Sequence, residues 1–128
     1  MNYYLLSAGI LSIALGLAHS ILGELLIFRY KRKEGTIIPT KHSKEMPEGH
    51  LRIIWASWHV ATFLAWGIGA TLINMALAAE PEQPWFSFFT AAITYTISAV
   101  GLCVLLATKG KHPGWIVSFV IVILLILA

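Results

Sequence analysis

Charged side chains are scarce in this sequence, and basic ones are absent from most of it. Asp, Glu, Lys and Arg make up 12% of the 128 residues, while 58% of the residues are hydrophobic. Soluble domains carry about twice this share of charge and fewer apolar residues. The composition therefore excludes an ordinary soluble protein and indicates one domain that lies within a lipid bilayer.

Cysteine is nearly absent as well, because Cys103 is the one cysteine and lies in an apolar run. An internal disulfide is therefore excluded. The sequence also has no nucleophile at a useful spacing from a base, no glycine-rich phosphate loop and no Cys-x-x-Cys pair. These patterns reveal common catalytic sites, so their absence favours a protein that is not an enzyme.

The nine basic residues fall in two short stretches, which are Arg29, Lys31, Arg32, Lys33, Lys41, Lys44 and Arg52, followed by Lys109 and Lys111. A third connecting segment carries Glu80 and Glu82 and no base. Short loops rich in Lys and Arg stay on the cytoplasmic side of a membrane. We therefore expect both basic loops in the cytoplasm, in a bacterial inner membrane. Anionic lipid headgroups, and not nucleic acid, are the expected partner of this charge.

Four apolar stretches are separated by these loops. A helix needs about 20 apolar residues to cross the hydrocarbon, and the predicted spans are 4–28, 51–77, 86–108 and the shorter 113–128, with a basic loop at residues 29–50. The predicted fold class is all-α. We expect a single transmembrane domain over residues 1–128, an integral membrane four-helix bundle that runs up-down-up-down, with both termini on the non-cytoplasmic side.

Small residues recur along two of the predicted spans. Gly9, Gly16 and Gly23 repeat every seven residues, and Thr94 and Gly101 share the same spacing. Helices in lipid approach closely where side chains are small, and a seven-residue repeat implies left-handed, nearly antiparallel packing. The two seams are expected to contact each other or a second copy of the protein.

Ionisable residues inside the spans are the candidate functional residues. They are costly in lipid, so they face the bundle interior and have partners. Counting from the loop ends predicts that His19 and His59 lie at one level. His19 and Glu24 are about 140° apart around their helix. The sequence thus predicts two clusters, His19 with His59 and Glu24 with Arg52.

Aromatic and hydroxyl side chains are expected to line a pocket around His59, namely Trp55, Thr62 and Trp66. Three interpretations of this region compete. In the first, the polar residues join the helices. In the second, the histidines hold haem b or a single transition metal, with electron transfer as the role. In the third, Glu24 carries protons in the transport of a small solute.

Two segments, H-S-I-L-G-E from His19 and R-I-I-W-A-S-W-H from Arg52, resemble a pattern in an uncharacterised group of small four-span bacterial membrane proteins. The resemblance covers about half of the chain and implies no substrate, reaction or ligand. Together these observations predict a membrane-embedded interaction or accessory protein with a buried His/Glu/Arg site, within a homo-oligomer or a larger membrane complex.

Overall fold

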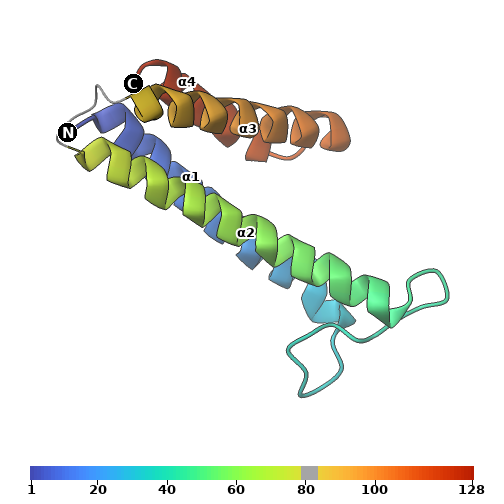
Figure 1. Ribbon diagram of the computed structural model, residues 1–128. Helices are drawn as coiled ribbons and strands as arrows, with labels where there is room; N and C mark the ends of the chain where they lie inside the picture. Colours follow the sequence, from blue (N-terminus) through green and yellow to red (C-terminus); the bar gives the residue numbers. More distant parts are fainter. Residues whose placement is uncertain (79–83) are drawn as a thin grey trace. The chain divides into compact units, whose positions relative to one another are not determined.

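The computed structural model describes residues 1–78 and 84–128 (Figure 1). In these ranges the chain forms four α-helices and one short 3-10 helix: α1 (Tyr3–Leu26), η1 (Phe28–Lys31), α2 (Glu48–Leu77), α3 (Pro84–Thr108) and α4 (Gly114–Ile126). The all-α prediction is confirmed. Glu80 and Glu82, expected in an acidic loop, lie outside the described residues.

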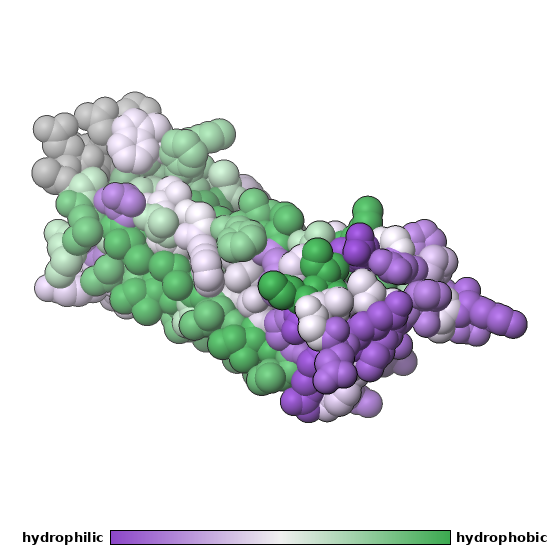
Figure 2. All heavy atoms as spheres, turned by 90° about the horizontal axis from the view of Figure 1, so that it is seen from below, coloured by the Kyte–Doolittle hydropathy of each residue, from purple (hydrophilic) through white to green (hydrophobic). Residues whose placement is uncertain are grey.

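Three of the helices are long and apolar enough to cross a membrane, namely α1, α2 and α3. Most of their large hydrophobic side chains are exposed, as suits helices surrounded by lipid. Figure 2 shows hydrophobic residues along the helices and hydrophilic ones gathered around the basic loop. These features are consistent with an integral membrane protein. The helix α4 has 13 residues, or about 20 Å, which is shorter than the hydrocarbon thickness of about 30 Å.

The helix boundaries differ slightly from the predicted spans. The helix α1 ends at Leu26, and η1 follows it with Phe28 fully buried. The helix α2 begins at Glu48, before the predicted start at Leu51. The helix α4 begins directly after Pro113, and the turn before it has positive φ angles of 51° at Lys109 and 75° at Gly110. A glycine tolerates this left-handed conformation without strain.

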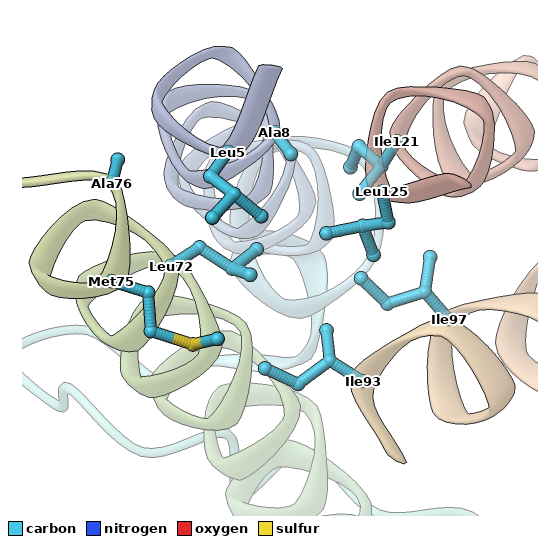
Figure 3. Close-up of a cluster of buried hydrophobic side chains, with 9 residues drawn as sticks. All are labelled: Leu5, Ala8, Leu72, Met75, Ala76, Ile93, Ile97, Ile121 and Leu125. Carbon is cyan, nitrogen blue, oxygen red and sulfur yellow. The ribbon is translucent and has the colours of Figure 1, made fainter. Parts of the chain in front are cut away.

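The chain divides into two compact units, residues 16–65 and residues 1–15 with 66–128, so that α1 and α2 contribute to both. The second of these units contains a buried cluster to which all four helices contribute (Figure 3). Its members are aliphatic side chains and one methionine: Leu5, Ala8, Leu72, Met75, Ala76, Ile93, Ile97, Ile121 and Leu125. Within this unit the helices therefore form a bundle.

Two glycines bring α1 and α2 together in the same unit. A Cβ atom at Gly9 would lie 2.8 Å from the carbonyl oxygen of Gly69, and one at Gly69 would lie 2.7 Å from that of Gly9. The indole of Trp66 donates to the Ile13 carbonyl at 3.2 Å, and the backbone N–H of Asn2 donates to the Ala76 carbonyl. These contacts pair the start of α1 with the end of α2, so the two segments run antiparallel.

Two glycines of the predicted seams contact other helices and not each other, while contact of the seams with a second copy stays a prediction. Gly9 packs against α2, and Gly101 lies against Ser118 of α4, where an added Cβ would be 3.0 Å from the Ser118 Cβ. Gly16 is buried, and the Thr94 hydroxyl donates to the Thr90 carbonyl of its own helix at 2.7 Å. Consecutive helices of a chain are usually neighbours in space, and the contacts of Gly9 and Gly101 follow this rule.

Neighbouring glycines of α2 test this packing directly. A methyl group at Gly69 would meet Ile13 Cγ1 at 2.6 Å, whereas nothing lies within 4 Å of one at Gly67. Alanine is the better helix former by about 1 kcal/mol. In detergent micelles we expect Gly67→Ala to keep or raise the free energy of unfolding and Gly69→Ala to lower it by about 1–3 kcal/mol. Equal effects of the two substitutions would contradict the close approach.

Candidate functional site

The candidate site lies in the unit formed by residues 16–65, where the second half of α1 faces the first half of α2. Trp58 of α2 donates its indole N–H to the His19 carbonyl of α1 at 2.9 Å. The same indole covers Gly23, where an added Cβ would lie only 2.1 Å from Nε1. The two segments therefore run antiparallel here as well, with their polar side chains between them.

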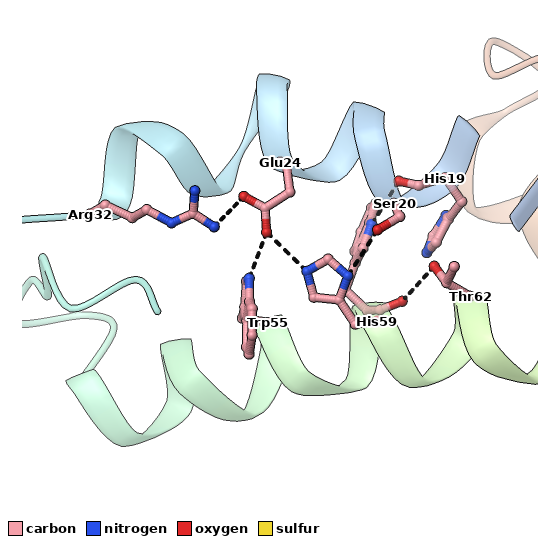
Figure 4. Close-up of polar contacts among 8 residues, drawn as sticks. His19, Ser20, Glu24, Arg32, Trp55, His59 and Thr62 are labelled. Atoms are coloured by element: carbon pink, nitrogen blue, oxygen red, sulfur yellow. Dashed lines mark hydrogen bonds and ion pairs between the residues drawn. The ribbon is translucent and has the colours of Figure 1, made fainter. Parts of the chain in front are cut away.

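Glu24 is the centre of a hydrogen-bonded network (Figure 4). The indole of Trp55 donates to Oε1 at 2.7 Å, and Nε2 of His59 lies 2.9 Å from the same oxygen. The guanidinium of Arg32 donates to the other oxygen, Oε2. Three nitrogens from two other segments thus converge on one carboxylate of α1. We call Ser20, Glu24, Arg32, Trp55 and His59 the Glu24 site.

His59 connects Glu24 to Ser20. Its Nδ1 lies 2.9 Å from the Ser20 hydroxyl, so both ring nitrogens have hydrogen-bond partners on α1. The Trp55 ring meets the imidazole edge-on, with centroids 4.7 Å apart. The side chain of His59 is 18% exposed and that of Glu24 is 25% exposed. The network therefore lies between the helices and not on an open surface.

The end of α1 explains how Arg32 reaches Glu24. The last helical turn gives way to η1, and the Ile27 amide still donates to the Gly23 carbonyl. Phe28 is buried and packs edge-on against Trp58, with ring centroids 5.7 Å apart. Arg32 follows η1 in an extended conformation. Its side chain then returns to a carboxylate eight residues earlier.

Trp58 builds the apolar wall of the site. Its ring stacks on His19, with centroids 4.2 Å apart and planes 8° from parallel. The contact with Gly23 leaves no space for any larger residue at that position. Trp58 was not predicted as a site residue, although it is the second of the two tryptophans of the R-x-x-W-x-x-W-H segment and directly precedes His59. A bulky ring opposite a helix glycine was the signal available.

The structure corrects the predicted pair of Glu24 and Arg52. Arg52 instead pairs with Glu48, one turn earlier on α2, at 3.1 Å, and both side chains are largely exposed. Glu24 pairs with Arg32. The physical reason is proximity: an i,i+4 acid is always within reach of a helical arginine, while η1 brings Arg32 to Glu24.

The predicted cluster of His19 with His59 is also rearranged. His59 bonds to Glu24 and Ser20, whereas His19 stacks on Trp58. Of the expected pocket lining, Trp55 contacts His59, and buried Thr62 donates to the Trp58 carbonyl at 3.5 Å. Trp66 belongs to the other unit, where it bonds to Ile13. His59 of one predicted cluster and Glu24 of the other therefore come together, while His19 and Arg52 have other contacts.

The side chains of the Glu24 site can accept protons and carry charge, but they do not form a set of metal ligands. Within residues 1–78 and 84–128, no three or more His, Cys, Asp or Glu side chains are grouped so that they could hold a metal ion. The two nitrogens of His59 and the two oxygens of Glu24 are all engaged in hydrogen bonds. The haem or metal site that the sequence suggested is not shown.

Comparison of the chain with family models, curated proteins and solved structures gave no significant match in any of the three. The resemblance to small four-span bacterial membrane proteins therefore stays a prediction, carried by the segments that contain Glu24 and His59.

Two arginines provide a matched pair for testing the site. Removal of the Arg32 side chain takes away a charged donor of Glu24, and such hydrogen bonds contribute about 1.5–3 kcal/mol. We expect Arg32→Ala to lower the free energy of unfolding in micelles by about 2 kcal/mol. Arg52→Ala breaks only an exposed i,i+4 pair, worth about 0.3–0.5 kcal/mol. A larger loss for Arg52→Ala would restore the pairing predicted from the sequence.

Proposed function

We propose that the protein is a membrane-embedded interaction or accessory protein in which the Glu24 site joins the first two helices. The observation that carries this proposal is the convergence of Trp55, His59 and Arg32 on one carboxylate. These donors come from α2 and from the basic loop, while the carboxylate belongs to α1. The Glu24 side chain therefore fixes α1, α2 and the start of the basic loop in one alignment.

The membrane environment explains why this hydrogen-bonded connection between α1 and α2, which we call the joint, matters. Buried polar groups are costly when unpaired, and lipid offers no water to satisfy them. Sliding α1 against α2 by one helical turn would separate Glu24 from both Trp55 and His59. Arg32 balances the charge of the carboxylate. The network thus favours one alignment of the helices, on which a surface for other membrane proteins can be built.

A metal- or haem-binding role is less well supported by the contacts. Coordination by His59 would require Nδ1 to leave Ser20 or Nε2 to leave Glu24. His19, the second candidate ligand, stacks against Trp58. The hydrogen-bonded joint needs no such rearrangement, so it accounts for the same residues with fewer assumptions.

We further propose that the basic loop lies on the cytoplasmic side and that both termini lie on the other side. The support is the distribution of Lys and Arg, which are concentrated in residues 29–52 and 109–111. In this loop Ile37 is 77% exposed and Tyr30 is 61% exposed. Exposed apolar residues among lysines suit a loop that lies against anionic lipid headgroups.

Ionised glutamates reduce the positive charge of this loop only in part. The backbone N–H of Glu45 and the Ser43 hydroxyl hydrogen-bond to the Glu45 carboxylate and hold its pKa below the usual value. Glu45 therefore stays ionised at neutral pH. The exposed Lys41 and Lys44, which precede Glu45 in the sequence, keep the local charge positive.

Absorption spectroscopy and elemental analysis separate the joint from a cofactor site. We expect protein purified in detergent, after growth with haem precursors and metal salts, to show no Soret band and no stoichiometric transition metal. His59→Ala is expected to lower its free energy of unfolding by about 1–3 kcal/mol, because Glu24 loses a donor. A haem or metal that is retained by the natural chain and lost in His59→Ala would overturn the proposal.

The orientation can be tested by labelling a single cysteine. In a Cys103→Ser background, Lys33→Cys places a thiol in the basic loop, where residue 33 is exposed. We expect an impermeant maleimide to leave this thiol unmodified in intact bacterial spheroplasts and to modify it after the membrane is opened. Tyr3→Cys, at the exposed start of α1, is the matched control and should react in intact spheroplasts. The reverse pattern would invert the proposed topology.

A further inference from the structure

We propose that His59 is a proton-binding site of this protein, which takes up one proton at Nδ1 beside Ser20 while its Nε2–H stays on the Glu24 carboxylate. The inference rests on the same contacts as the proposed joint, but it concerns what His59 carries and not what holds the helices together.

The partners of Glu24 determine which ring nitrogen bears the proton in neutral His59. Trp55 Nε1 and Arg32 Nη2 are donors in every accessible protonation state, and they occupy Oε1 and Oε2. An ionised carboxylate only accepts hydrogen bonds. His59 Nε2, which lies 2.9 Å from Oε1, is therefore the third donor. Nδ1 of the neutral ring is then an acceptor for the Ser20 hydroxyl, 2.9 Å away.

The same contacts also satisfy the protonated ring. A hydronium ion transfers a proton that forms a new N–H bond at Nδ1 and leaves a water molecule, and this nitrogen becomes a donor. The Ser20 hydroxyl can donate or accept, so it rotates and accepts the new hydrogen bond through its oxygen. Nε2–H stays on Glu24. Proton uptake therefore needs the rotation of one hydroxyl and breaks no contact between α1 and α2.

The charges around His59 suit both the neutral and the protonated imidazole. Glu24 of α1 faces the ring and supplies the counter-charge for an imidazolium, while Arg32 supplies the counter-charge for Glu24 when the ring is neutral. His19 of α1 lies against Trp58, and Arg52 of α2 is paired with Glu48. The net charge of Glu24, Arg32 and His59 thus changes from zero to plus one. Ionisable residues paired in this way within membrane helices are typical of proton-carrying sites.

Other histidines have different surroundings and serve as internal controls. Nδ1 of His112 accepts the Gly114 amide at 3.1 Å, and Nδ1 of His42 lies 3.4 Å from the Thr40 carbonyl. Within the described parts of the chain, His59 is the histidine that has a carboxylate on one nitrogen and a hydroxyl on the other.

Nitrogen-15 NMR of histidine-labelled protein in lipid nanodiscs tests the proposal, with His59→Gln used to identify the His59 signals. At alkaline pH we expect one tautomer, with Nε2 protonated and Nδ1 unprotonated. On acidification the Nδ1 shift should move through the full change to a protonated nitrogen while Nε2 stays protonated. A neutral ring protonated at Nδ1 would overturn the proposal. So would shifts that stay constant over the whole pH range in which the protein remains folded.

Glu24→Gln provides a second test. Its readout is the tautomer of neutral His59, which a purely structural role of Glu24 would leave unchanged. The glutamine amide can either accept from Nε2 or donate to it, so the neutral ring should change from one tautomer to a mixture of two. Glu34→Gln, in the exposed basic loop, is the matched control and should change nothing. A single Nε2–H tautomer in folded Glu24→Gln would show that Glu24 does not fix the ring. Because the joint is measured by unfolding and this site by ring shifts, either proposal can fail alone.

Discussion

The need to satisfy one carboxylate in an apolar helix organises the unit formed by residues 16–65. Glu24 lies within α1, which is otherwise almost wholly uncharged, and an unpaired carboxylate there would be costly. Its three donors come from α2 and from the chain after η1. Trp55, His59 and Arg32 therefore together satisfy the carboxylate of Glu24.

Close packing supports this polar centre with an apolar wall. Trp58 can stack on His19 and bond to its carbonyl only because Gly23 leaves space for the indole. Phe28 closes the same wall from the end of the helix. The small residue Gly23 thus lies opposite the large Trp58, so the indole packs against the α1 backbone.

Hydrophobicity alone was enough to predict the helices, and the rarity of Glu24 and His59 within them was enough to predict a site. The partner of Glu24 could not be predicted, because Arg32 reaches it through an irregular turn after α1. Arg52 was chosen by counting residues along two straight helices, which ignores Glu48 on its own helix face. The role of Trp58 was missed because an aromatic residue in a membrane helix has many possible neighbours.

A double-mutant cycle between Glu24 and His59 measures the central interaction most directly. The free energies of unfolding in micelles would be compared for the natural chain, Glu24→Gln, His59→Gln and the double variant. Contacting residues in one hydrogen-bond network couple by about 0.5–3 kcal/mol, whereas polar pairs in membrane helices average about 0.6 kcal/mol. We expect a coupling of at least about 1 kcal/mol, since this hydrogen bond involves a charged group. A coupling indistinguishable from zero would contradict the account.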